Sequence, residues 1–332
     1  MIAAFPSEDR AAARLMVVDR RRGEIFHGAF SSLGEFLRPG DLLVFNDTKV
    51  LPARLRGKKE SGGSVEVLLL EHFPGRDSLW IALVDAARKP QVGGRIFFDS
   101  RVYAQVIGDL GKGRYGLRFI HPGDFMEVLE RLGEPPLPPY IHRTRPIAPL
   151  DWERYQTVYA SNPGAMAAPT AGFHFTQNLL NELEAKGVER VFLTLHVGPG
   201  TFQPVRDRVV ERHRMEGERY LLRPEAAEKI DRAQKEGRRV IAVGSTTTRA
   251  LEGIAQKKGR VEAGDGLARL FIYPGYPFRV IDGLITNFHL PGSTPLILVA
   301  AFAGLDLMRR AYPEAVRLGY RFYSYGDAML IL

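Results

Sequence analysis

Residues Arg238–Gln256 read RRVIAVGSTTTRALEGIAQ, and this stretch decides the fold class. Its first half predicts a buried strand, and the run of hydroxyl residues after Gly244 predicts the start of a helix. The same order occurs on both sides of it. Upstream, ERVFLTLHVGPG (189–200) predicts a strand and a turn, and a helix is predicted between Pro224 and Gly237. Downstream, GLITNFHLPGSTPLILVAAFAG (283–304) predicts strand, loop and helix. This alternation predicts an α/β domain.

An earlier segment, Ser64–Ile120, has a different character. Short runs that alternate apolar and polar residues are separated by Gly-rich turns such as GDLGKG. Such a pattern predicts several short antiparallel strands that form a small barrel or sandwich. A helix is predicted directly after it, with Asp124 as its cap and Gly133 as its end. The small β domain is therefore expected to be inserted into the α/β domain.

Composition and charge narrow the class of protein. The 332 residues are 45% hydrophobic and 25% charged, as in ordinary globular proteins. The longest apolar run, Leu296–Ala303, is much shorter than the ~20 residues of a membrane span, and Glu8 and Asp9 argue against a signal peptide, so we expect a cytoplasmic protein. The absence of cysteine excludes disulfides, thiolate nucleophiles and metal-thiolate sites. The net charge of +8 mildly favours a polyanionic partner such as nucleic acid.

Three of the eight histidines share a sequence setting. His174, His196 and His289 each lie between apolar residues beside a Gly/Pro loop. A single histidine in such a setting is more often a core residue, but ligands of α/β sheets bind at strand ends that are followed by loops. Three matching contexts therefore indicate a shared pocket. The run Gly244, Ser245, Thr246 and Thr247 is expected to leave free amides at a helix start, where a carboxylate or phosphate can bind.

The residues alone leave more than one function open. Three histidines can also hold zinc, so a metal-dependent hydrolase is a second hypothesis, although their wide spacing is not specific. A non-catalytic RNA-binding protein is a third. Neither a Walker lysine motif nor GxGxxG occurs, so the usual nucleotide signatures are absent. Arg249 could pair with a phosphate or carboxylate, and the aromatic residues near the histidines could stack on a purine.

Longer motifs carry a resemblance to a known family. They are DLLVFNDTKVLPARLRG, YQTVYASNPGAMAAPTAGFHF, LTLHVGPGTFQPV, IAVGSTTTRALE, FIYPGYPFRVIDGLITNFHLPGST and YRFYSYGDAMLIL, in this order along nearly the whole chain. Together they closely resemble the S-adenosylmethionine:tRNA ribosyltransferase-isomerases of queuosine biosynthesis. The sequence departs from this family at Glu216-Gly217, where the family usually reads His-Ser, and in having few residues before RLMVVDR.

The resemblance implies a fold and a reaction. The expected fold is an α/β catalytic domain of residues 1–56 and 146–332, interrupted by a β-barrel domain of residues 57–145. The expected reaction moves the ribosyl part of S-adenosylmethionine onto 7-aminomethyl-7-deazaguanine in a tRNA anticodon, isomerises it, and releases adenine and methionine. S-adenosylmethionine is then a consumed co-substrate, no metal is expected, tRNA is the partner, and the protein is expected to be a monomer.

The same resemblance, set against the residues, gives the expected site. Acid/base or positioning roles are expected for His174, His196 and His289. The methionine carboxylate is expected on the amides of Gly244 to Thr247, and the sulfonium against Phe173 or Tyr273. The remaining expected substrate-binding residues are Gly198, Gly200, Arg249 and Asn287. Contacts with tRNA are expected from Arg54, Arg56, Lys58 and Arg143.

Overall fold

The computed structural model describes residues 2–73, 78–138, 140–141, 149–198, 205, 207 and 209–332. Its contacts divide the chain into two compact units. The first comprises Met1–Lys49, Pro139–Thr144 and Arg154–Leu332, and the second comprises Val50–Pro138 and Arg145–Glu153. The first division falls between Lys49 and Val50, earlier than the expected boundary at 56/57, because strand β5 (Arg54–Lys59) belongs wholly to the second unit.

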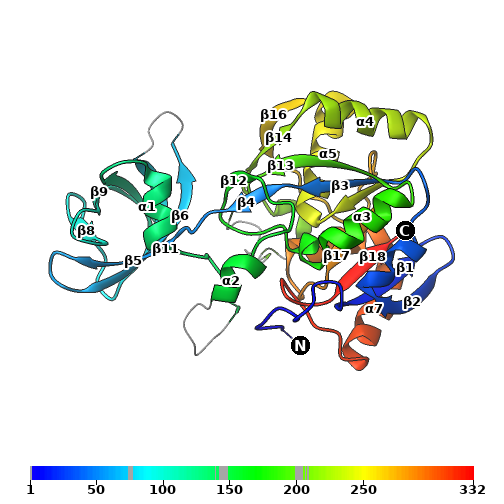
Figure 1. The fold of residues 1–332 in the computed structure, drawn as a ribbon, viewed down its shortest axis with the longest axis horizontal. Helices are drawn as coiled ribbons and strands as arrows, with labels where there is room; N and C mark the ends of the chain where they lie inside the picture. The colour runs from blue at the N-terminus through cyan, green and yellow to red at the C-terminus, as the bar shows by residue number, and fades with distance from the viewer. Residues whose placement is uncertain are drawn as a thin grey trace. The chain divides into compact units, whose positions relative to one another are not determined.

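Within the described residues, the first unit is built on a nine-stranded mixed sheet (Figure 1). Its strands, in spatial order, are β16 (Gly264–Ala268), β14 (Glu218–Leu222), β13 (Glu189–Leu195), β3 (Leu42–Asn46), β15 (Val240–Val243), β17 (Gly283–Asn287), β18 (Ala328–Ile331), β1 (Arg14–Asp19) and β2 (Glu24–Ala29). The four central strands β13, β3, β15 and β17 run parallel to one another. Their carboxyl ends therefore meet at one edge of the sheet, which is where α/β folds bind ligands.

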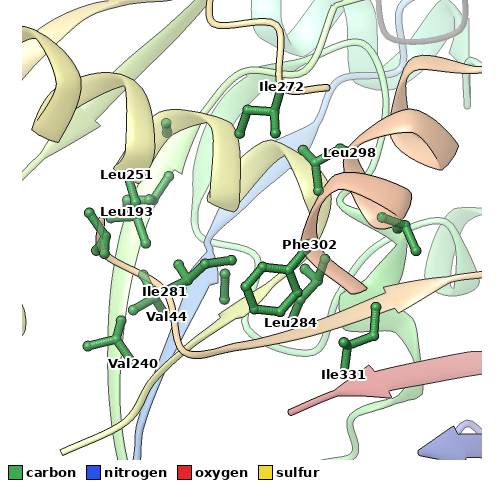
Figure 2. Close-up of a cluster of buried hydrophobic side chains, with 14 of the residues drawn as sticks. Val44, Leu193, Val240, Leu251, Ile272, Ile281, Leu284, Leu298, Phe302 and Ile331 are labelled. Carbon is green, nitrogen blue, oxygen red and sulfur yellow. The ribbon is translucent and has the colours of Figure 1, made fainter. Parts of the chain in front are cut away.

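Helices cover both faces of this sheet. The elements that pack on it are η1 (Phe30–Glu35), η2 (Thr170–His174), α3 (Gln177–Ala185), α4 (Pro224–Lys235), α5 (Ser245–Lys258), α6 (Thr294–Ala303) and α7 (Leu305–Arg317). Alternate residues of one strand belong to opposite cores, as in β3, where Leu42 and Val44 face α4 to α7, and Leu43 and Phe45 face η1 and α3. Figure 2 shows the first of these cores, where Leu251 and Phe302 meet side chains of the sheet such as Val44.

The second unit is a closed antiparallel barrel, as the resemblance implied. Its six strands pair in the ring β5, β6, β7, β10, β9 and β8, which closes through the pairing of β8 with β5. Their bounds are β5 (Arg54–Lys59), β6 (Ser64–His72), β7 (Leu79–Asp85), β8 (Arg95–Phe97), β9 (Tyr103–Gly111) and β10 (Arg114–Ile120). Helix α1 (Phe125–Leu132) follows, and Asp124 caps it by accepting a hydrogen bond from the amide of Met126.

Short elements complete the described chain. They are β4 (Thr48–Val50), which pairs with β12 (Asn162–Ala165), β11 (Gly133–Glu134), which pairs with β5, α2 (Pro149–Arg154) and η4 (Val210–Arg212). No helix in these ranges is both long and apolar enough to span a membrane. The α/β fold with an inserted barrel, expected from the alternating patterns, is therefore confirmed.

Candidate active site

A cavity lies at the carboxyl ends of the neighbouring parallel strands β15 and β17, where helices α5 and α6 begin. All residues that line it belong to the first unit. The described lining consists of small, hydroxyl and aromatic residues with one histidine: Tyr140, Ala168, Pro169, Thr170, Ala171, Val197, Gly244, Ser245, Thr246, Thr286, Asn287, His289, Ser293, Pro295, Tyr323 and Ser324. Because these described residues include no Lys, Arg, Asp or Glu, the polarity of the described lining comes from amides, hydroxyls and imidazole.

The start of α5 presents backbone N–H groups at this cavity. Gly244 precedes the helix with φ of 100°, a conformation that glycine adopts without steric cost. No side chain of the described residues caps this end, and the hydroxyl of Thr247 instead donates to the carbonyl of Val243. The first-turn amides and the positive end of the helix dipole can therefore bind an anion. The sequence suggested that the amide of Gly244 would also be free. In the structure it is not, because it donates a hydrogen bond to the carbonyl of Ile285.

The start of α6 lies on the same cavity. Ser293 caps this helix by accepting a hydrogen bond from the amide of Leu296 at 3.4 Å, and its hydroxyl donates to the carbonyl of Leu290. Ser293 and Pro295 both line the cavity. Two helix N-termini thus border one cavity, as strand-to-helix connections at adjacent parallel strands allow.

Asn287, at the end of β17, organises the hydrogen bonds around the cavity. Its Nδ2 donates to the carbonyl of Tyr323 at 3.2 Å and lies 3.1 Å from Nε2 of His174, while its Oδ1 accepts from the hydroxyl of Thr170 at 3.2 Å. A carbonyl can only accept, so the contact with Tyr323 fixes which side of the amide carries the hydrogens. Nε2 of His174 therefore accepts, and its ring proton is on Nδ1.

His174 is buried beneath the cavity and does not line it. It ends the short helix η2, packs 5.1 Å from the ring of Phe30, and is 4% exposed. Burial lowers its pKa to about 4, so the imidazole is neutral at pH 7. Unlike His196 and His289, this histidine does not follow a strand, because the residues before it form a 3-10 helix. Its Nε2 lone pair is already bound by Asn287.

His289 is the histidine that lines the cavity. Its Nε2 lies 2.9 Å from the hydroxyl of Thr286, and its backbone amide donates to the hydroxyl of Tyr312 at 3.3 Å. The side chain is half-buried, and the surrounding protein lowers its pKa below the ordinary value by desolvation. A neutral imidazole in contact with the cavity can accept or donate a proton.

His196 follows β13 and lies beside the cavity rather than in its lining, to which the next residue, Val197, belongs. Its Nδ1 lies 2.8 Å from the hydroxyl of Thr48. The imidazole covers Gly164, where a Cβ atom would come within 2.6 Å of the ring, so only glycine fits there. Desolvation lowers the pKa of His196, and the charge of Asp47 partly opposes this effect.

Aromatic residues were expected at the site, but those that line the described cavity are Tyr140 and Tyr323 and not Phe173 or Tyr273. The rings of Tyr140 and Tyr323 lie 3.9 Å apart, and the hydroxyl of Tyr140 forms a hydrogen bond with that of Ser324. Tyr323 has φ of 69°, a conformation that non-glycine residues seldom adopt and that is frequent at functional sites. The quoted motif YRFYSYGDAMLIL contains this residue, but no sequence pattern reveals its backbone angle.

Several expected substrate-binding residues lie elsewhere. Phe173 packs against Tyr155 and Tyr325, and Tyr273 lines a separate groove. Arg249 is buried, with its Nη1 2.7 Å from Oε2 of Glu218 and its other nitrogens donating to the carbonyls of Leu270 and Ala268. The amide of Gly198 donates to the same Glu218 at 3.3 Å. Gly200 lies outside the described residues.

The side chains expected to contact tRNA differ in their exposure and in their hydrogen bonds to other groups of the protein. Arg54 donates to Glu66 and to the carbonyl of Leu137, so it holds the barrel unit together. Arg56 is exposed but pairs with Glu134 at 3.1 Å. Lys58 is exposed on β5, and Arg143 lies outside the described residues. No group of His, Asp and Glu in the described chain could hold a metal ion, so the three histidines do not form the zinc site of the second hypothesis there.

Comparisons with known proteins agree with this architecture. A family model described as a queuosine biosynthesis protein matches residues 1–331. Proteins named S-adenosylmethionine:tRNA ribosyltransferase-isomerase from Caldanaerobacter subterraneus and Symbiobacterium thermophilum are 50% and 51% identical, each match covering 100% of this chain and 96% of the relative.

A crystal structure of S-adenosylmethionine tRNA ribosyltransferase from Thermotoga maritima is also similar. It is 37% identical, covers 100% of this chain and 96% of its own, and superposes with a TM-score of 0.56. A match that spans both units and includes the motifs around the cavity shows the family. The chain belongs to the S-adenosylmethionine:tRNA ribosyltransferase-isomerase family of queuosine biosynthesis.

Proposed function

We propose that this chain is a tRNA-modifying transferase. It transfers and isomerises the ribosyl group of S-adenosylmethionine onto the aminomethyl group of 7-aminomethyl-7-deazaguanine in a tRNA anticodon, and it releases adenine and methionine. The observation that supports this proposal most directly is the cavity at the N-termini of α5 and α6. Its described lining consists of amides, hydroxyls, aromatic rings and one histidine. Family membership supports the same reaction.

In this proposal the N-terminus of α5 holds the methionine carboxylate. The amides of Ser245 and Thr246 lie in the unsatisfied first turn and both residues line the cavity. A carboxylate there gains from the helix dipole without a salt bridge. The rings of Tyr140 and Tyr323 provide the aromatic wall against which the sulfonium or the adenine lies.

The three histidines have different roles in the proposal. His289 moves a proton, because it lines the cavity and is neutral at pH 7. The reaction needs a base at the acidified ribose carbon next to the sulfonium, and a proton donor or hydrogen-bond donor for the departing adenine. His174 is a positioning residue that acts through Asn287, and His196 positions the strand end that carries Val197.

The direct test mixes the protein with S-adenosylmethionine and an anticodon stem-loop that contains the precursor base. Adenine and methionine are expected to appear together in equal amounts, with the ribosyl group covalently bound to the RNA. Mass spectrometry of the RNA and chromatography of the small molecules give the measurement. RNA that binds without any release of adenine would contradict the proposal.

A chelator separates this function from the metal-dependent hydrolase. The proposal requires no metal, so treatment with a chelator is expected to leave the rate of adenine release unchanged. Loss of that rate, restored by added zinc, would favour the hydrolase instead.

A further inference from the structure

A second hollow of the first unit is a groove of about 590 Å³ that does not share a residue with the cavity described above. It runs between α5, the strands β14 and β16, and the segment around His213. Aromatic and basic side chains both line it, and Glu211 is its one acidic lining residue among those described. None of the residues given a role in the proposed reaction lines this groove.

Half-buried aromatic rings form the floor of the groove. The rings of His213 and Phe271 lie 4.9 Å apart, and those of Phe271 and Tyr273 lie 5.7 Å apart. Tyr220 also lines the groove from β14. Neighbouring half-buried rings that line a groove suit planar ligands such as nucleic-acid bases, because every base has a face that can stack.

Three cations flank these rings. Arg214, Lys257 and Arg269 are exposed, line the groove, and form no ion pair within the described chain. Arg249, two turns before Lys257 on the same helix, is by contrast buried against Glu218. Arg269 lies over Gly217, where a Cβ atom would be 3.0 Å from its Nε, so the absence of a side chain there gives its guanidinium room.

We propose that this groove binds a single-stranded part of the substrate RNA. Phosphates lie on Arg214, Lys257 and Arg269, and bases stack on Phe271 and Tyr273. The assignment rests on the proposed function, which supplies an RNA substrate. RNA fits better than an acidic peptide, because cations alone would serve a peptide, whereas cations and aromatic rings in one groove match both parts of a nucleotide.

The test compares the double variant Lys257→Glu/Arg269→Glu with the control Lys229→Glu/Arg232→Glu, which reverses two exposed cations on α4. Affinity for a fluorescent precursor stem-loop is measured by anisotropy, without S-adenosylmethionine, at several salt concentrations. The groove variant is expected to bind at least about tenfold more weakly, and its slope of log affinity against log salt is expected to fall by about two, one for each lost phosphate contact. The control is expected to keep the wild-type affinity and slope.

The rings are tested separately. Phe271→Ala is expected to weaken binding by about tenfold with an unchanged salt slope, since stacking is not ionic. Phe271→Tyr is expected to restore the affinity. Circular dichroism melting of each variant shows whether it is folded. If Phe271→Ala does not fold, the comparison of Lys257→Glu/Arg269→Glu with its control still decides the groove assignment.

The outcomes separate this inference from the proposed function. Wild-type affinity and slope in Lys257→Glu/Arg269→Glu would overturn the groove assignment even if adenine is released normally. Loss of binding to polyglutamate but not to RNA in the same variant would also overturn it, in favour of an acidic protein partner. If the wild type binds RNA through the groove but releases no adenine, the proposed reaction fails and the groove assignment stands.

Discussion

The cavity and the groove of the first unit use opposite kinds of polarity. The described lining of the cavity has no ionised residue, and its polar groups are fixed amides and hydroxyls held by strands and helix starts. The groove has three exposed cations on flexible side chains. Fixed dipoles select a small ligand by geometry and are little affected by salt, whereas exposed charges attract a polyanion over a distance and are screened. The cavity therefore suits a small molecule, and the groove suits the RNA proposed for it.

His289→Gln is expected to have the largest effect on the cavity side of this comparison. Removal of a group that moves a proton typically lowers a rate by about 10²–10⁴. We therefore expect kcat for adenine release to fall by this factor, with unchanged affinity for the stem-loop. Steady-state kinetics and anisotropy give the two values.

The matched control is His72→Gln, on β6 of the barrel unit, which is expected to keep kcat. Near wild-type turnover of His289→Gln would show that the cavity histidine does not move the proton. Thr286→Val, which removes the hydroxyl beside Nε2 of His289, is expected to give a smaller loss.

Arg249→Leu tests whether a buried arginine differs from the groove arginines. It removes the guanidinium from the buried carboxylate of Glu218, and breaking such an ion pair costs about 3–5 kcal/mol. We expect urea denaturation to show a loss of this size in the free energy of unfolding, while the salt slope of RNA binding is unchanged. The double variant Arg249→Leu/Glu218→Leu is expected to recover much of the stability. A wild-type stability of Arg249→Leu, together with weaker RNA binding, would place Arg249 among the RNA contacts.

The buried histidine beneath the cavity makes stability depend on pH. The pKa of His174 falls from 6.5 to about 4 on folding, so the unfolded chain binds more protons between these values. Stability is complete above pH 6.5 and is lost as the pH falls toward 4, by about 3 kcal/mol. Urea denaturation at pH 7 and near pH 4.5 measures the loss. His174→Gln is expected to show a shallower pH dependence, and an identical dependence in both proteins would contradict the burial of a neutral His174.

The sequence predicted the layers of the fold and the strand-to-helix turn at Gly244 that borders the cavity. Strand and helix periodicities are local, so the order strand, glycine, hydroxyl run and helix around Gly244 was enough to predict a helix start there. The binding of an anion at this helix start stays a prediction. The inserted barrel was predicted from short runs of alternating apolar and polar residues, because this alternation is also a local pattern.

Sequence could not assign the individual side chains, because their partners are distant in the chain. His174 is buried by Phe30 and held by Asn287, 113 residues away, and Arg249 meets Glu218, 31 residues before it. The left-handed conformation of Tyr323 depends on contacts of its backbone with Phe288 and Asn287. The groove also brings together residues from three separate segments, so its cations look like ordinary surface residues in the sequence.

The smallest expected effect is that of salt on the KM values of the two substrates, and it distinguishes the cavity from the groove directly. A rise from about 50 to about 200 mM NaCl is expected to raise KM for the RNA about 20- to 40-fold, because three groove cations release counterions from phosphates with a slope near 0.7–0.9 for each contact. KM for S-adenosylmethionine is expected to change less than about twofold. In the proposal the ligand is bound by helix N-termini in direct contact with it, and salt screens such contacts less than it screens exposed charges. The two constants are measured in one adenine-release assay with the other substrate saturating. If KM for S-adenosylmethionine followed salt as steeply as KM for RNA, an ionised side chain would have to reach that substrate, and the division between fixed dipoles and exposed charges would be wrong.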